Sequence, residues 1–237
     1  DVAAGADRVE EIVTTRFGAQ SASPFAVAQM GCFDPFGAMF LFCRWQDEMT
    51  ERTRQHIERG MTRNVHGRGN TENHWLMHYT AQLLAAERFT DVDIWWNGLP
   101  REVVHAEATR WILGTIDRTA RIGHHEYDST DYHGWHVLPM IALADHARDD
   151  VVSQRASDMA TLLIADMALE YFKGGWAGGH AREGYRENTW TSIGCSATLM
   201  YLYFGGPTFG PKQAQQQMGP ALTAAYEPPE ILCAIAN

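Results

Sequence analysis

The chain has 237 residues, of which 45% are hydrophobic and 11% aromatic, and its formal net charge is −10. This length and composition suit a folded protein with a sizeable core and exclude an intrinsically disordered chain. The acidic balance argues against a nucleic-acid partner, because phosphate backbones attract basic faces. No apolar run approaches the roughly 18 residues that a membrane-spanning helix needs, so we expect no such span.

Apolar residues recur at helical spacing along most of the chain. This spacing predicts helices over residues 9–17, 34–59, 72–89, 101–122, 137–146, 151–172, 188–204, 213–218 and 219–226. Asp34-Pro35 and Thr71 are typical of helix starts, and Gly123 is typical of a helix end. No strand alternation of convincing length occurs. We therefore expect an all-α fold of antiparallel helix hairpins, arranged as a bundle or as an α/α toroid.

The first polar cluster lies at the predicted start of the 72–89 helix, where Glu72, Asn73 and His74 follow Thr71. Free N–H groups and the positive end of the helix dipole favour a bound anion there. The same field lowers the pKa of an imidazole, so His74 is expected to be neutral and able to accept a proton. Asn73 can donate its amide N–H groups to a carboxylate. The structural alternative is that Asn73 caps the helix and His74 is a hydrogen-bonded core residue.

The second polar cluster covers residues 124–136 and holds four histidines, two tyrosines and three carboxylates. Tyr127 or Tyr132 can act as a general acid or base if a neighbour shifts its pKa. A pair drawn from Glu126, Asp128 and Asp131 can instead hydrolyse a glycosidic bond. The structural alternative is a polar loop in which Asp131 or Thr130 caps the next helix.

Aromatic and basic residues lie in or beside the predicted loops. The aromatic ones, expected to include about two that stack on sugar rings, are Trp95, Trp96, Trp135, Trp176 and Tyr185. Arg182 and Arg186 can bind a substrate carboxylate in a two-pronged contact, or can form surface ion pairs with Glu183 and Glu187.

The sequence gives weaker evidence for a metal site or for disulfide bonds than for the two polar clusters. His74 and His78 share one helix face, and with Glu126, Asp131 or His133 they can form a divalent metal site. The four cysteines lack C-x-x-C spacing, so we expect free thiols and no zinc ribbon.

Two short blocks resemble a known enzyme family. The stretch from Asn73-His74 to Gln82 resembles the Asn-His signature of alginate-lyase-like and heparinase-like polysaccharide lyases. The stretch Asp131-Tyr132-His133-Gly134-Trp135-His136, which leads into a Leu-Pro turn, resembles the helix start that bears the tyrosine of that family. In this alignment the family's tyrosine falls on Trp135 and its arginine on Asp128, so Tyr132 is the expected replacement.

The resemblance implies an α/α toroid that cleaves an acidic, uronate-containing polysaccharide by β-elimination, without a cofactor and in a secreted or periplasmic setting. Asn73 would neutralise the uronate carboxylate, and His74 would take the C5 proton or assist in its removal; His133 is counted with these catalytic residues. Tyr132 would protonate the leaving oxygen. The residues expected to bind substrate are Glu72, Tyr127, Asp128, Trp135, Arg182 and Arg186.

We expect one toroid domain over residues 1–237, either minimal or part of a longer chain. Three other functions stay open. A glycoside hydrolase would use carboxylates from Glu72, Glu126, Asp128 or Asp131. A non-catalytic glycan-binding protein would bury Asn73 and His74, and a metal-dependent hydrolase or isomerase would need an ion at His74 and His78.

Overall fold

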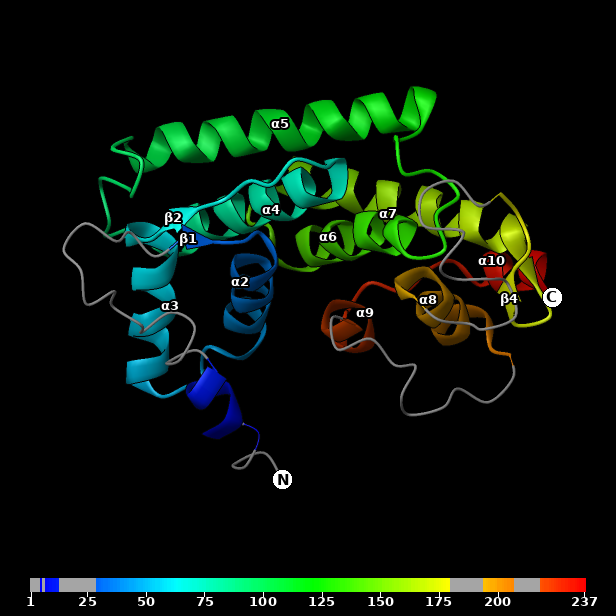
Figure 1. Ribbon diagram of the computed structural model, residues 1–237, viewed down its shortest axis with the longest axis horizontal. Helices are drawn as coiled ribbons and strands as arrows, with labels where there is room; N and C mark the ends of the chain where they lie inside the picture. Colours follow the sequence, from blue (N-terminus) through cyan, green and yellow to red (C-terminus); the bar gives the residue numbers. More distant parts are fainter. Residues whose placement is uncertain (1–4, 6, 13–28, 180–193, 207–217) are drawn as a thin grey trace. The chain divides into compact units, whose positions relative to one another are not determined.

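The computed structural model describes residues 5, 7–12, 29–179, 194–206 and 218–237. The principal helices are α2 (Phe33–Trp45), α3 (Glu51–Arg63), α4 (Glu72–Arg88), α5 (Arg101–Ile122), α6 (Tyr132–His146), α7 (Asp150–Glu170), α8 (Cys195–Phe204), α9 (Gly219–Thr223) and α10 (Glu230–Ala236) (Figure 1). Two pairs of two-residue strands accompany them: β1 (Gln29–Met30) runs parallel to β2 (Val65–His66), and β3 (Tyr171–Phe172) runs antiparallel to β4 (Gly175–Trp176). The predicted all-α class is confirmed.

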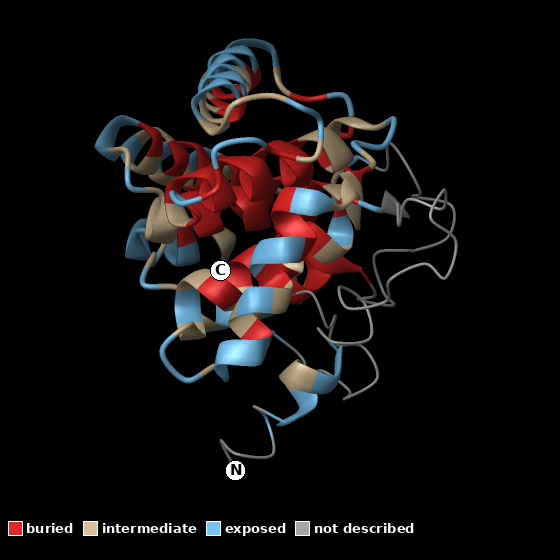
Figure 2. Cartoon of the chain, turned by 90° about the vertical axis from the view of Figure 1, so that its left-hand side faces the viewer, coloured by how far each residue is buried: buried red, intermediate tan, exposed pale blue. Residues whose placement is uncertain are grey.

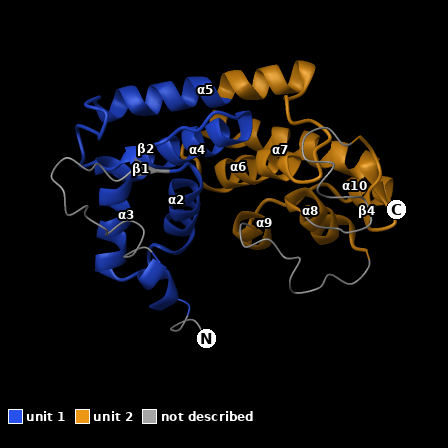
Figure 3. Cartoon of the chain, in the orientation of Figure 1, with its two compact units in different colours: residues 1–112 blue, residues 113–237 orange. Residues whose placement is uncertain are grey.

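The chain divides into two compact units, Asp1–Ile112 and Leu113–Asn237, and the division falls within α5 (Figure 3). In the first unit, α2 packs against both α3 and α4, and β1 pairs with β2. In the second unit, α6 and α7 form a closely packed pair that α8 and α10 also contact. None of the described helices is long and apolar enough to cross a membrane.

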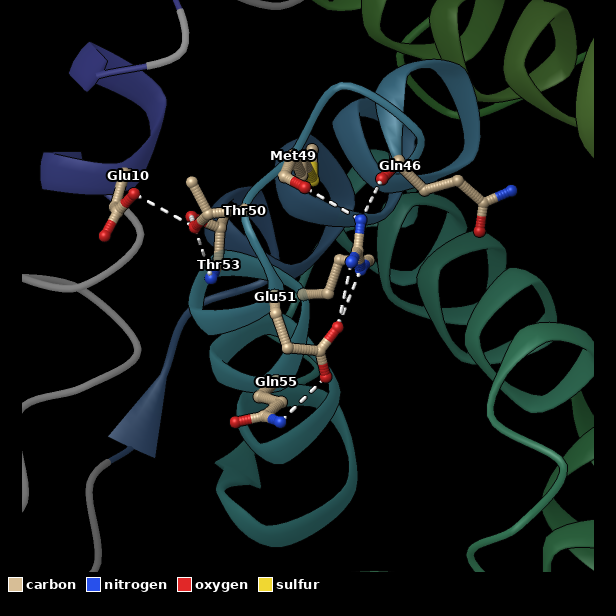
Figure 4. A network of polar contacts seen from close by, with 8 residues as sticks. Glu10, Gln46, Met49, Thr50, Glu51, Thr53 and Gln55 are labelled. Carbon is tan, nitrogen blue, oxygen red and sulfur yellow. Dashed lines mark hydrogen bonds and ion pairs between the residues drawn. The ribbon is translucent and has the colours of Figure 1, made fainter.

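The sequence predicts one helix over residues 34–59, but the structure has two helices separated at residues 46–50. Thr50 is the N-cap of α3, and its hydroxyl accepts a hydrogen bond from the Thr53 N–H at 3.2 Å (Figure 4). Arg54 donates to the carbonyl oxygens of Gln46 and Met49, at 2.9 and 2.7 Å. The cap and the guanidinium together satisfy backbone groups that a helix end leaves open, so they stabilise the break.

α6 begins at Tyr132, whereas the prediction places its start at residue 137. Its residues 133–143 are buried without interruption, which makes it the central helix of its unit; buried positions are red in Figure 2. Pro139 therefore lies inside the helix and not in its first turn. Neither Asp131 nor Thr130 makes the expected cap: the Ser129 hydroxyl accepts from the Tyr132 N–H at 2.9 Å. The Asp131 carboxylate accepts instead from the Cys195 N–H, at 2.8 Å, where α8 begins.

Other predicted elements agree closely with the structure or lie partly outside the described residues. The helices over 72–89 and 101–122 are confirmed, and Gly123 follows α5 with a φ of +75° that favours glycine. α7 ends at Glu170, two residues before the predicted end. Residues 13–17, 188–193 and 213–217 of other predicted helices lie outside the described ranges.

All four cysteines are free thiols, as expected. Cys32 is buried in the first unit and Cys195 in the second, Cys43 is half-buried and Cys233 is exposed. Burial raises the pKa of the Cys32 thiol to about 11, so this thiol is protonated at neutral pH.

Candidate active site

The first polar cluster is built into the start of α4. Asn73 is fully buried, and the Thr71 hydroxyl donates a hydrogen bond to its Oδ1 atom. Thr71 occupies the N-cap position, but its side chain makes no cap hydrogen bond. His74 is half-buried, with its ring edge-on to Phe33 at a centroid separation of 5.2 Å. Gly69 lies so close that an added Cβ atom would be 2.5 Å from Nδ1 of His74.

The structure does not support a metal site at His74 and His78 within the part of the chain that it describes. Among the residues with described positions, neither His74 nor His78 belongs to any group of three close metal-ligating atoms. His78 instead lines a pocket with His66 and Arg68 in the first unit.

Three buried histidines, His124, His133 and His136, lie together in the second unit, where the second polar cluster meets α7. His133 is fully buried, and its Nε2 atom lies 3.0 Å from the carbonyl oxygen of Leu163. A carbonyl only accepts, so Nε2 of His133 carries the proton and Nδ1 is the acceptor. Nε2 of His124 lies 3.3 Å from that Nδ1 and therefore donates to it. The His124 ring also stacks on His136 at 3.9 Å, and Nε2 of His136 donates to the Glu126 carboxylate at 3.2 Å.

His133 and His124 are neutral near pH 7. Burial lowers the pKa of His133 to about 4, although the Leu163 carbonyl and Asp166 act in the opposite direction. Burial, together with His136 and His133, also lowers the pKa of His124. Nδ1 of His133 is 3.9 Å from an Asp166 oxygen, a distance compatible with an ion pair. We interpret it as a contact with a neutral ring, because desolvation of a fully buried imidazole outweighs one partly exposed carboxylate.

A tyrosine and three carboxylates lie beside these histidines. The Tyr127 hydroxyl donates a hydrogen bond to Oδ1 of Asp166, and that bond is the main reason why the pKa of Tyr127 is raised. Burial raises the pKa of Glu170, and the negative charges of Asp128 and Asp166 raise it further. The Glu170 carboxyl group is thus held towards its protonated form beside Asp128 and Asp166. We call Tyr127, Asp128, Asp166 and Glu170 the acidic cluster.

Two members of the acidic cluster, Tyr127 and Asp166, line a pocket of about 540 Å³. Gly123, His124, Tyr127, Leu163 and Asp166 are among its lining residues. Tyr127 is 41% exposed, so its phenol is accessible from solvent.

Two glycines pack directly against the acidic cluster. An added Cβ atom at Gly178 would overlap the Glu170 carboxylate, and one at Gly179 would lie 2.6 Å from Oδ2 of Asp128. Glycine at these two positions lets the chain pass close to both carboxylates. Gly178 and Gly179 therefore help to enclose and desolvate the carboxylates of Glu170 and Asp128.

The structure places the other predicted site residues as follows. Glu72 is half-buried at the start of α4, and Tyr132 is half-buried at the start of α6. Trp135 is only 6% exposed and belongs to the core, as do Trp95 and Trp176. Arg182, Tyr185 and Arg186 lie outside the described residues.

Asp166 and Glu170 were missed by the sequence analysis. They are spaced i, i+4 near the end of α7, so they share one face of a helix that otherwise buries mainly apolar residues. That spacing is a signal that the sequence contains. Tyr127, the hydrogen-bond partner of Asp166, however, comes from a different part of the chain.

Comparisons with protein families, curated proteins and solved structures gave no match to this chain.

Proposed function

We propose that this protein is a carbohydrate-active enzyme that cleaves a glycosidic bond, and that its helices form part of an α/α toroid. The packed helices of both units and the two blocks that resemble polysaccharide lyases support this proposal. The chemical support is a solvent-accessible pocket that presents a tyrosine and a carboxylate, with neutral imidazoles behind them.

Hydrolysis by the acidic cluster is the reaction that this geometry favours. The observation that carries it is the Tyr127–Asp166 hydrogen bond at the pocket wall, one helical turn from a carboxyl group with a raised pKa. Glycoside hydrolysis needs one protonated and one ionised carboxyl group, and their environments must separate the two pKa values. Glu170 would donate the proton to the leaving oxygen. Asp166, oriented by Tyr127, would take a proton from the water that attacks the anomeric carbon, so that the bond to the water oxygen forms as the bond to the leaving oxygen breaks.

β-Elimination of a uronate-containing glycan is the second candidate. The neutral state of His133 favours it, because a neutral imidazole can accept a proton. In this reaction Asn73, His74 and Tyr132 have the roles that the lyase resemblance implies.

One experiment separates the two reactions. The protein is incubated with neutral and with uronate-containing polysaccharides, and both new reducing ends and the ultraviolet absorbance of unsaturated uronates are followed. Hydrolysis gives reducing ends alone, whereas β-elimination gives both signals. Product in neither measurement would contradict the proposal that this protein cleaves glycans.

Variants then locate the site. Asp166→Asn and Glu170→Gln should each lower the hydrolytic rate by roughly 10²–10⁴-fold, because each removes an acid–base group but keeps the side-chain shape. Asp158→Asn is the matched control, since Asp158 is exposed on the same helix. Unchanged thermal unfolding shows that the variants are folded. Full hydrolytic activity in Asp166→Asn would refute the assignment, and a loss confined to His74→Ala and Tyr132→Phe would favour the lyase.

A further inference from the structure

A second pocket, of about 210 Å³, lies within the first unit. Side chains of α4 and α5 and of the loop that holds Trp96 and Asn97 line it. The pocket has room for several water molecules. It is smaller than the roughly 300–1,000 Å³ that drug-sized ligands occupy. Its volume therefore suits a ligand of one ring.

One wall of this pocket is fixed by hydrogen bonds. Nε2 of His66 donates to the carbonyl oxygen of Gly60 at 2.9 Å, so its Nδ1 atom accepts from the Gln82 amide, also at 2.9 Å. The ring of Trp96 lies nearly parallel to His66, with the centroids 5.7 Å apart. This arrangement holds an aromatic side chain at the pocket before any ligand binds. Flat aromatic surfaces of this kind pack well against the apolar C–H faces of sugar rings.

A ladder of polar groups forms a second wall. Arg68 donates to the Tyr79 hydroxyl at 3.3 Å, and that hydroxyl donates to Glu107 at 3.1 Å. The Tyr79 ring stacks on Trp111 at 4.6 Å, which fixes the position of the phenol. One positive and one negative side chain line the pocket together, so their charges offset each other. The pocket is therefore not expected to prefer an anionic or a cationic ligand.

The remaining polar groups offer both donors and acceptors. Nε1 of Trp96 is buried and has no hydrogen-bond partner among the described residues. Oδ1 of Asn97 accepts from the Leu99 N–H, and this bond does not engage the amide nitrogen of Asn97. Burial, with help from His66 and Arg68, lowers the pKa of His78 to about 4, so its imidazole is neutral. A neutral imidazole has one donor and one acceptor, and a sugar hydroxyl likewise donates and accepts.

From this geometry we propose that the pocket lined by His78, Gln82, Trp96, Asn97 and Glu107 binds one neutral, hydroxyl-rich ring, chemically a single uncharged sugar residue. The stacked indole would bind the apolar face of the ring. Glu107, Asn97 and Gln82 would bind its hydroxyl groups. The site does not depend on which bond the acidic cluster cleaves.

Binding of simple sugars to the whole chain tests this proposal. Saturation-transfer NMR and calorimetry are run with methyl glycosides of neutral hexoses, with uronic acids and with inorganic phosphate as separate probes. We expect only the neutral sugars to bind, with Kd roughly in the millimolar range for one ring. No binding of any neutral sugar would overturn the proposal, and so would tighter binding of the uronic acids or phosphate.

Variants connect the binding to the pocket. Glu107→Gln should weaken it by roughly tenfold or more, because a hydrogen bond to a charged group is lost. Asn97→Ala should weaken it less. Glu102→Gln, at an exposed position on the same helix and outside the pocket, should leave Kd unchanged. Equal affinity in Glu107→Gln and Glu102→Gln would overturn the assignment. Asp166→Asn should keep sugar binding even where it abolishes cleavage, so the two proposals can fail separately.

Discussion

Replacement of His78 should change how the stability of the first unit depends on pH. The folded-state pKa of His78 is about 4, whereas the ordinary pKa of a histidine side chain is 6.5. Between these two values the unfolded chain binds the proton and the folded chain does not. Acidification through this window therefore lowers the free energy of unfolding. His78→Gln removes the group that titrates and should reduce this loss.

The size of the effect follows from the two pKa values. Between about pH 7.5 and about pH 4.5, the His78 contribution amounts to about 2.5 kcal/mol of lost stability. Other buried histidines, such as His66, titrate in both proteins, so the difference between wild type and variant isolates His78. Denaturant unfolding at both pH values, followed by tryptophan fluorescence, measures that difference.

The measurement distinguishes a desolvated His78 from a solvated one in the folded protein. If desolvation of His78 lowers its pKa, the gap between wild type and His78→Gln narrows or reverses as the pH falls. If the two proteins lose stability in parallel, His78 is solvated in the folded state and the reasoning fails. His125→Gln, at an exposed position, gives the effect of removing an imidazole from the surface.

Three further substitutions test the second unit, each by thermal unfolding. Asp131→Ala should cost about 1 kcal/mol, because its carboxylate accepts the Cys195 N–H at the start of α8; Asp131→Asn, which keeps an acceptor, should cost less. Gly134→Ala should cost about 1–3 kcal/mol, since its new Cβ atom would lie 2.7 Å from Sγ of Cys195, and a neutral result would show that the contact relaxes freely. Leu138→Ala should cost about 2–5 kcal/mol because its side chain is fully buried, whereas Leu169→Ala, at an exposed position, should cost far less; equal losses would contradict the burial argument.

The sequence predicts helices well where the spacing of apolar residues agrees with the residues that typically begin or end a helix. The 101–122 helix has regular apolar positions and ends before Gly123, and the structure has the same bounds. The break at residues 46–50 was missed because it depends on Arg54, which donates to two carbonyl groups beyond its own helix. The spacing of apolar residues does not reveal that an arginine will donate to carbonyl groups outside its own helix.

The site was only partly predictable, for a different reason. The dense run of polar residues at 124–136 drew attention to Tyr127 and Asp128, which the structure places near Asp166. The same polarity made the start of α6 look like a loop, although His133 and His136 are buried there. Asp166 joins Tyr127 only through tertiary packing, which sequence spacing does not reveal.

Each unit contains one buried cysteine, and the reaction of that thiol with a reagent measures local unfolding of its unit. Cys32 in the first unit and Cys195 in the second are both inaccessible in the folded state, whereas Cys233 is exposed. A thiol-reactive reagent should modify Cys233 at once and the two buried cysteines only when their surroundings open. Mass spectrometry of the labelled peptides would then give two separate opening rates from one sample. Equal rates would show that the halves of the chain unfold as one cooperative body, and unequal rates that each half opens independently.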